Sequence, residues 1–182
     1  MHIFRPSIYK KNIFDIDYKK LKDEGIKCLI FDLDNTLGLI DHKKCPSKSK
    51  KLINELKKDF LIVICSNNTF KRIKPYVEEL GIFGASFSLK PSIKGLFTIR
   101  RKYNLKKNEM VMIGDQIVTD VFSGNRFGIK TILVDPMGEK DLKITSLNRK
   151  IEKIIVNNYM KKGMFERGKY YGWFKKMFRM WG

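Results

Sequence analysis

The sequence predicts an α/β fold: a doubly wound, Rossmann-like and mostly parallel sheet of about five strands, with helices on both faces. Short apolar runs alternate with segments of helical periodicity between residues 26 and 134, and this alternation favours a parallel sheet. Polar clusters directly follow the apolar runs, which is where sheets of this kind bind ligands. The 182 residues, 43% of them hydrophobic, suffice for one domain with a buried core.

The expected strands are short and apolar, as strands that are covered on both faces require. The first, Ile26–Leu33, is ended by polar residues. The others are Phe60–Cys65, Ala85–Leu89, Met110–Ile113 and Lys130–Val134.

The expected helices separate these strands and repeat apolar residues at helical spacing. Their ranges are Pro46–Lys58, Thr69–Leu80, Ile93–Tyr103 and Val118–Phe127. Gly81 is a plausible stop for the second helix, and Pro75 within that helix predicts a kink or a break.

Three parts of the chain differ in composition. We expect a basic, aromatic lead-in over residues 1–25, a domain over residues 26–156 and a basic, aromatic tail over residues 157–182. No apolar run approaches the ~20 residues that span a bilayer. Met1–Ile13 also lacks the apolar stretch of a secretory signal, so a cytoplasmic protein is expected.

The net charge and the cysteine content limit the partners and the cellular compartment that we expect for this chain. The chain has 38 Lys and Arg residues against 19 Asp and Glu residues, and a net charge of +19 attracts acidic lipid, nucleic acid or a phosphorylated substrate. Cys28, Cys45 and Cys65 are odd in number and form no CxxC pair. They predict neither a disulfide framework nor a zinc site, and a reducing compartment fits them.

Four polar clusters follow the expected strands and should meet at one rim of the sheet. They are Asp32–Thr36 (DLDNT), Ser66–Thr69 (SNNT), Lys90-Pro91, and Gly114–Gln116 with Thr119-Asp120. Carboxylates brought together there repel one another unless a cation lies between them, and a few hard oxygen ligands suit Mg²⁺. With Lys90 and the Ser66 hydroxyl as donors, the rim predicts a site for a phosphoryl group, and a carboxylate there can also act as a nucleophile.

These clusters resemble the four motifs of the haloacid dehalogenase superfamily of phosphatases, over about residues 3–155. The sequence is more closely similar to the YqeG-like branch, which includes phosphatidylglycerophosphate phosphatases of bacteria and mitochondria. The resemblance is carried by Asp32–Leu37 (DLDNTL), Ser66–Asn68 (SNN), Lys90-Pro91 and Gly114–Arg126 (GDQIVTDVFSGNR), and the lead-in adds Arg5-Pro6 and Ile13–Ile16.

The resemblance implies a covalent mechanism with Mg²⁺ as cofactor. Asp32 would be the nucleophile that becomes phosphorylated, and Asp34 would protonate the leaving oxygen and then activate water. Mg²⁺ would be held by Asp32, by the backbone carbonyl of Asp34 and by Asp115.

The resemblance also implies the residues around the phosphate. Ser66 and Asn67 would bind phosphate, and Lys90 would neutralise the nucleophile and the phosphoryl oxygens. Thr36 would fix the loop that carries the first motif. Asp120 would orient Lys90 or a metal-bound water.

Spacing predicts that the site has no cap domain. From Asp34 to Ser66 is 66 − 34 = 32 positions, and from Ser66 to Lys90 is 90 − 66 = 24, each filled by one helix and one strand. An open site admits a phosphate that is attached to something large.

The tail predicts a short amphipathic helix that lies at a membrane interface. Within Tyr159–Gly182, seven basic residues stand against one acid, Glu166. One helical face would carry Tyr170, Trp173, Phe174, Met177, Phe178 and Trp181, and the other Lys175, Lys176 and Arg179. Packing of this helix on the domain itself, or stacking of its aromatic residues on nucleic-acid bases, stays open.

The sequence therefore predicts a Mg²⁺-dependent phosphomonoesterase, peripheral on the inner face of the membrane. The resemblance implies that it converts phosphatidylglycerophosphate to phosphatidylglycerol on an anionic phospholipid surface. A nucleic-acid partner is not expected, and the oligomeric state stays open. The alternatives are a phosphatase of nucleotides, nucleic-acid ends or small sugar phosphates, a non-catalytic basic adaptor on membrane or RNA, and a receiver-like signalling domain.

Overall fold

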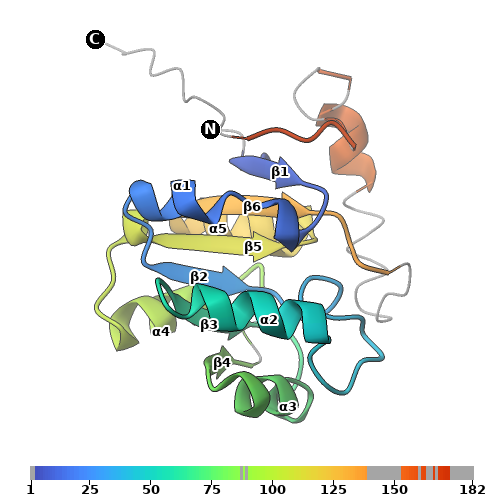
Figure 1. Ribbon diagram of the computed structural model, residues 1–182. Helices are drawn as coiled ribbons and strands as arrows, with labels where there is room; N and C mark the ends of the chain where they lie inside the picture. Colours follow the sequence, from blue (N-terminus) through green and yellow to red (C-terminus); the bar gives the residue numbers. More distant parts are fainter. Residues whose placement is uncertain are drawn as a thin grey trace.

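Six parallel strands form one sheet in the order β1-β6-β5-β2-β3-β4 (Figure 1). The structure, a computed structural model, describes residues 3–86, 88, 90–138, 153–159, 161–162, 166 and 168–172. The strands are β1 (Ile8–Lys10), β2 (Cys28–Phe31), β3 (Leu61–Cys65), β4 (Phe83–Ala85), β5 (Met110–Gly114) and β6 (Lys130–Val134). The α/β fold class is thus confirmed, with one strand more than the five expected.

The strand order reverses between β2 and β5. From β2 the chain continues outward to β3 and β4, and then returns to the other side of β2 to form β5 and β6. Phe31 at the end of β2 pairs with Ile64 of β3 and Ile113 of β5, so these three strands end at nearly the same level. Residues just after them meet where such sheets bind ligands.

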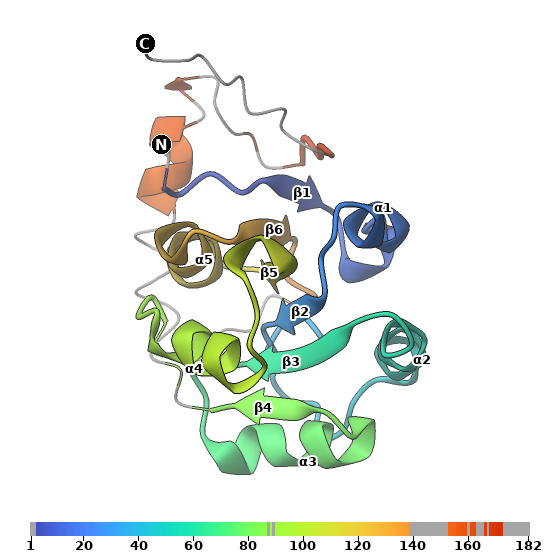
Figure 2. The ribbon, with the colours of Figure 1, turned by 90° about the vertical axis from the view of Figure 1, so that its left-hand side faces the viewer.

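Helices cover both faces of the sheet (Figure 2). The side chains of α1 (Tyr18–Asp23), α2 (Ser47–Leu56) and α3 (Phe70–Leu80) pack into one buried cluster with alternate strand residues such as Leu29 and Phe31. Those of α4 (Lys94–Lys102) and α5 (Phe122–Phe127) pack with the intervening residues, such as Cys28 and Ile30. This alternation explains why both faces of β2 are apolar.

Three short helical segments complete the fold. The 3₁₀ turns η1 (Ile13–Asp15) and η2 (Lys107–Glu109) precede α1 and β5, respectively. Between β5 and α5 the chain forms the π-helical segment η3 (Ile117–Val121). Such wide turns are often found at functional sites.

The lead-in belongs to the sheet, since it supplies β1, which pairs with β6. A strand of three residues is too short for a visible alternation of apolar and polar residues, and the sequence pattern therefore gave no sign of it. The third expected strand, Ala85–Leu89, is observed earlier, as β4. Gly84 lets β4 approach α3, because a side chain there would meet Val77 and Ile73.

Pro75 does not break α3, which runs continuously over Phe70–Leu80. Ile73, Tyr76 and Leu80 are all buried on its inner face, and this packing outweighs the lost backbone hydrogen bond. Gly81 ends the helix as expected, with a φ of 59° in the left-handed region that favours glycine.

The described part of the tail packs on the domain. Tyr159, at the end of the helical residues 153–159, packs against a buried cluster that includes Tyr9, Leu133 and Val156. Tyr171 pairs antiparallel with Tyr9 through two backbone hydrogen bonds of 3.1 and 3.0 Å, and the Tyr170 hydroxyl donates to Asp135 at 2.6 Å.

The predicted amphipathic helix is therefore not observed at Tyr170 and Tyr171. Its remaining members, residues 173–181, lie outside the described residues. Among the residues that are described, no helix is long and apolar enough to cross a membrane.

Candidate active site at the carboxyl ends of the strands

The chain turns sharply just after β2. The Asp32 backbone N–H still donates to Ile113 of β5 at 2.8 Å, but the Leu33 carbonyl already accepts from the N–H of Leu37 at 2.9 Å. Asn35 has a φ of 63°, a conformation that asparagine tolerates better than most residues. This turn places a bend in the backbone between Asp32 and the end of the first motif.

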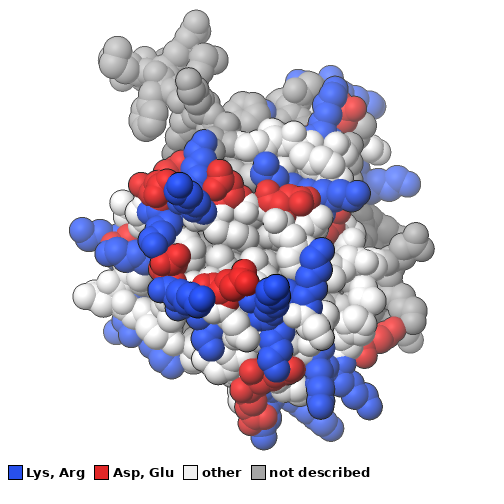
Figure 3. Space-filling model, in the orientation of Figure 1, with Lys and Arg blue, Asp and Glu red and all other residues white. Residues whose placement is uncertain are grey.

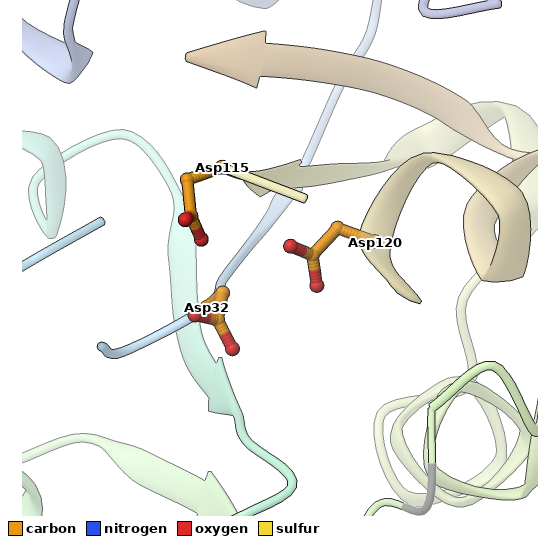
Figure 4. A group of neighbouring side chains, drawn as sticks. All are labelled: Asp32, Asp115 and Asp120. Carbon is orange, nitrogen blue, oxygen red and sulfur yellow. The ribbon is translucent and has the colours of Figure 1, made fainter. Parts of the chain in front are cut away.

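Three carboxylates converge at this turn. Asp32, Asp115 and Asp120 are all buried, and one oxygen of each lies within 4.8 Å of the others (Figure 4). Asp115 directly follows β5, and Asp120 lies in η3. Gly114 leaves room for this approach, because a β-carbon at that position would overlap the Asp120 carboxyl.

The Lys90 ammonium joins two of these carboxylates. Its Nζ lies 2.5 Å from Oδ1 of Asp32 and 2.6 Å from Oδ1 of Asp120. Burial acts to lower the pKa of Lys90, but the carboxylates of Asp120 and Asp32 outweigh burial and hold this pKa above its ordinary value. Burial, opposed by Lys90, raises the pKa of Asp32 to about 7.

The three carboxylates could hold a metal ion. One lysine cannot balance three acids, and buried carboxylate oxygens are ligands that Mg²⁺ prefers. Asp120 occupies the position expected of a residue that orients Lys90, and its oxygens also face the metal candidates Asp32 and Asp115. Thr36 is buried beside them, and its hydroxyl donates to Asp115 over 3.4 Å.

The carboxylate of Asp34 is held by side chains that follow β3. Its Oδ1 accepts from Nη2 of Arg72 at 2.7 Å and from Nε at 3.1 Å, and its Oδ2 accepts from the Asn68 amide at 3.0 Å. Arg72 also donates to the carbonyls of Leu39 and His42, at 3.2 and 2.9 Å. The carboxylate of Asp34 thus faces the start of α3.

The second motif fixes the backbone of Lys90. The Asn67 side chain accepts from the Lys90 N–H at 2.6 Å and donates to its carbonyl at 2.8 Å. The Asn67 oxygen also accepts from the Ser88 hydroxyl at 3.0 Å, so both ends of this amide are engaged within the protein. Ser66 is buried, and its hydroxyl oxygen accepts from the Asn68 N–H at 3.1 Å.

Sequence reasoning missed Arg72 and gave Asn68 no role. Arg72 lies outside every recognised motif, and its contact with Asp34 requires the turn after β2 and the start of α3 to meet. Asn68 belongs to the SNN cluster, and its position shortly after an expected strand was the sequence signal that could have indicated a role in the site.

Comparison with known families and proteins adds independent findings. Residues 29–89 match the family described as haloacid dehalogenase-like hydrolase, and residues 89–155 match a HAD-hydrolase-like family. The chain is 40% identical over 161 residues to the probable phosphatase YqeG of Bacillus subtilis. This alignment covers 88% of this chain and 94% of that protein.

More distant similarity extends to lipid phosphatases. Phosphatidylglycerophosphate phosphatase 1 of Arabidopsis thaliana (chloroplastic/mitochondrial) is 25% identical over 170 residues, covering 87% of this chain and 49% of that protein. The chloroplastic enzyme of the same name from Chlamydomonas reinhardtii is 26% identical over 143 residues, covering 72% and 53%. This chain therefore spans about half the length of those two proteins.

Solved structures show the same fold. A predicted HAD-like family hydrolase from Porphyromonas gingivalis aligns with a TM-score of 0.52 at 14% identity, covering 69% of this chain and 98% of that one. A HAD family enzyme from Bacteroides thetaiotaomicron, solved with magnesium and inorganic phosphate, aligns with a TM-score of 0.50 at 13% identity, covering 66% and 99%.

Proposed function

The chain belongs to the haloacid dehalogenase-like hydrolases and is a phosphatase of that family, and on this basis we propose that it dephosphorylates phosphatidylglycerophosphate to phosphatidylglycerol with Mg²⁺ as cofactor. The observation that carries the chemistry is the position of Asp32. This carboxylate stands at the end of β2, beside the Lys90 ammonium and within one acidic cluster with Asp115 and Asp120. Such a group is placed to attack a phosphoryl group that the surrounding cations neutralise.

In the proposed first step, a carboxylate oxygen of Asp32 forms a bond to phosphorus as the bond to the alcohol oxygen breaks. In this step Asp34 leaves its contact with Arg72, carries a proton and gives it to that oxygen, so the alcohol leaves neutral. Asp34 then takes a proton from water, the water oxygen bonds to phosphorus, and Asp32 is released together with inorganic phosphate. Lys90 offsets the charge on Asp32 and on the phosphoryl oxygens, and the Ser66 hydroxyl donates to phosphate.

The donor set fits a bound Mg²⁺. Asp32 and Asp115 would hold the ion with the backbone carbonyl of Asp34, and Asp120 would keep Lys90 in place. When bound, Mg²⁺ supplies positive charge to the phosphoryl oxygens. A bound ion would also offset the charge of the three buried acids that share this rim with Lys90.

Three features support a lipid substrate. Two relatives are named as phosphatidylglycerophosphate phosphatases. Between Asp34 and Ser66, a stretch that the structure describes in full, the chain forms only α2 and β3, and no cap is inserted there. The net charge of +19 favours an anionic surface, and on the face in Figure 3 the basic side chains are widely spread and interspersed with acidic ones.

We propose that the tail contacts the membrane. Residues 173–182 carry both tryptophans together with Lys175, Lys176 and Arg179, a composition that suits the boundary between headgroups and acyl chains. We place the protein on the cytoplasmic side of an anionic membrane.

The decisive experiment measures Mg²⁺-dependent phosphate release from matched substrates. These are phosphatidylglycerophosphate in phosphatidylcholine vesicles, glycerol 3-phosphate, a nucleoside monophosphate and an oligonucleotide with a 5′-phosphate. We expect kcat/KM to be highest for the lipid, and Asp32→Asn protein serves as the control for contaminating phosphatases. A higher kcat/KM on any of the soluble substrates would reject the lipid assignment and leave the phosphatase chemistry intact.

A further inference from the structure

Apolar side chains border the Asp34 side of the site. Two large hydrophobic side chains there are exposed to solvent, Phe70 by 53% and Met137 by 42%. Phe70 is the first residue of α3, whose Arg72 contacts Asp34. The Met137 N–H donates to the carbonyl of Asn35 at 2.9 Å, which places Met137 beside the turn after β2.

Leu39 connects these two positions. Its carbonyl accepts from Arg72 at 3.2 Å, and its side chain lies against Gly138, where a β-carbon would approach Leu39 to 2.6 Å. The turn after β2 and the segment after β6 lie at the same end of the sheet (Figure 1). We call Leu39, Ile40, Phe70 and Met137 the apolar collar; Leu39 and Ile40 are half-buried.

The position of the collar matters because Asp34 indicates on which side of the site the leaving group of the substrate lies. In the proposed mechanism, Asp34 protonates the leaving oxygen, so the alcohol portion of the substrate extends toward the side where Asp34 lies. Single exposed hydrophobic residues are ordinary on protein surfaces. Exposed and half-buried apolar side chains from three segments near the leaving-group side form a feature that points to an apolar neighbour.

Basic side chains flank the collar. Lys43 and Lys44 are exposed in the same loop as Leu39 and Ile40, and Lys71 is exposed next to Phe70. The acidic residue in this loop is Asp41. Apolar side chains beside lysines suit a phospholipid bilayer, because its interior is hydrocarbon and its headgroup surface is anionic.

We propose that the apolar collar and Lys43, Lys44 and Lys71 dock the catalytic domain on an anionic phospholipid bilayer, with the mouth of the site toward the lipid. The assignment of the leaving-group side rests on the proposed function. This contact is separate from residues 173–182, and it would bring the phosphorylated headgroup to Asp32 without extracting the lipid from the bilayer.

The test compares two pairs of variants of the full chain by flotation with vesicles. Phe70→Ser/Met137→Ser removes the exposed part of the collar, and Phe97→Ser is the matched control, since Phe97 is 43% exposed on α4. Lys43→Gln/Lys44→Gln is compared with Lys51→Gln/Lys58→Gln, which removes two exposed lysines near α2.

We expect the collar double variant to bind vesicles that contain phosphatidylglycerol about tenfold or more weakly than wild type, since each side chain loses apolar contact with lipid. The Lys43/Lys44 variant should lose affinity mainly at low salt, and both controls should bind as wild type does. Thermal unfolding midpoints verify that each variant is folded.

Among the variants, two results would overturn this docking surface: wild-type affinity in the folded collar double variant, or an equal loss in Phe97→Ser. Absence of wild-type binding to anionic vesicles would do the same. Failure of the proposed function gives a different pattern, in which wild type binds vesicles through the collar and releases no phosphate from the lipid.

Discussion

The ammonium nitrogen of Lys90 lies 2.5 Å from Oδ1 of Asp32, and this contact joins residues that are 58 positions apart in the sequence. Lys90 is held on its other side by Asp120 and along its backbone by Asn67. The lysine therefore has little freedom to move, and the nucleophile faces a fixed positive charge. Preorganised charge of this kind is effective because it needs no rearrangement during the reaction.

Asp32→Asn should remove turnover and leave the fold nearly intact, because the amide keeps the shape of the side chain and lacks the attacking charge. We expect phosphate release to fall by roughly 10⁴-fold or more. Asp23→Asn, which changes an exposed carboxyl at the end of α1, is the matched control. Release by pure Asp32→Asn protein at a rate near that of wild type would exclude the covalent mechanism.

Asp34→Asn should have its largest effect on substrates with poor leaving groups. An alkyl oxygen needs a proton as it leaves, so we expect a loss of roughly 10²–10⁴-fold on an alkyl phosphate. Para-nitrophenyl phosphate leaves without that help, and its phosphorylation step should be less affected. Single-turnover measurements separate this step from hydrolysis of the intermediate, and equal losses on both substrates would make Asp34 a structural residue.

Gly114→Ala should reduce turnover through Asp120. A β-carbon at position 114 would overlap the Asp120 carboxyl and displace it from Lys90. We expect kcat to fall at least about tenfold, and the matched control is Gly172→Ala, where a β-carbon meets no atom of the described residues within 4 Å. A folded Gly114→Ala protein with wild-type kcat would show that the position of Asp120 does not matter.

Removal of Mg²⁺ should abolish activity, and added Mg²⁺ should restore it. Ca²⁺ should not replace it, because Ca²⁺ takes more ligands at longer distances than Mg²⁺ does, and the proposed site offers few. The measurement is phosphate release in chelator followed by titration with each ion. Full activity in excess chelator would rule out a metal at Asp32 and Asp115.

Deletion of residues 173–182 should weaken vesicle binding and spare the turnover of a small soluble phosphate. The deletion removes three basic residues, which lowers the net charge from +19 to +16, and each contributes about 1 kcal/mol near an anionic surface. It keeps residues 168–172, which pack against β1. Vesicle affinity and para-nitrophenyl phosphate hydrolysis are measured together, and unchanged affinity would reject the tail as a membrane contact.

Much of the fold follows from the sequence because local patterns are sufficient for it. Strands such as Phe60–Cys65 are continuous apolar runs, and each polar cluster stands where a parallel strand must end. These rules also place Asp32, Lys90, Asp115 and Asp120 at one rim, and the structure brings these four together.

Other features depend on contacts between distant segments, which no local pattern records. Strand β1 exists because Ile8–Lys10 pairs with β6, more than 100 residues later. The contact of Arg72 with Asp34 likewise requires the turn after β2 and the start of α3 to meet. Pro75 shows the same limit, since burial of α3 decides the outcome against a strong local preference.

The pairing of Tyr9 with Tyr171 has a consequence for self-association. Strand β1 lies at the border of the sheet, where unpaired N–H and C=O groups can recruit a strand from another molecule and start aggregation. The antiparallel bridge occupies both backbone groups of Tyr9. Among the described residues, it is Tyr171 that covers this border at Tyr9, so we expect a truncated chain without residue 171 to associate more readily through β1.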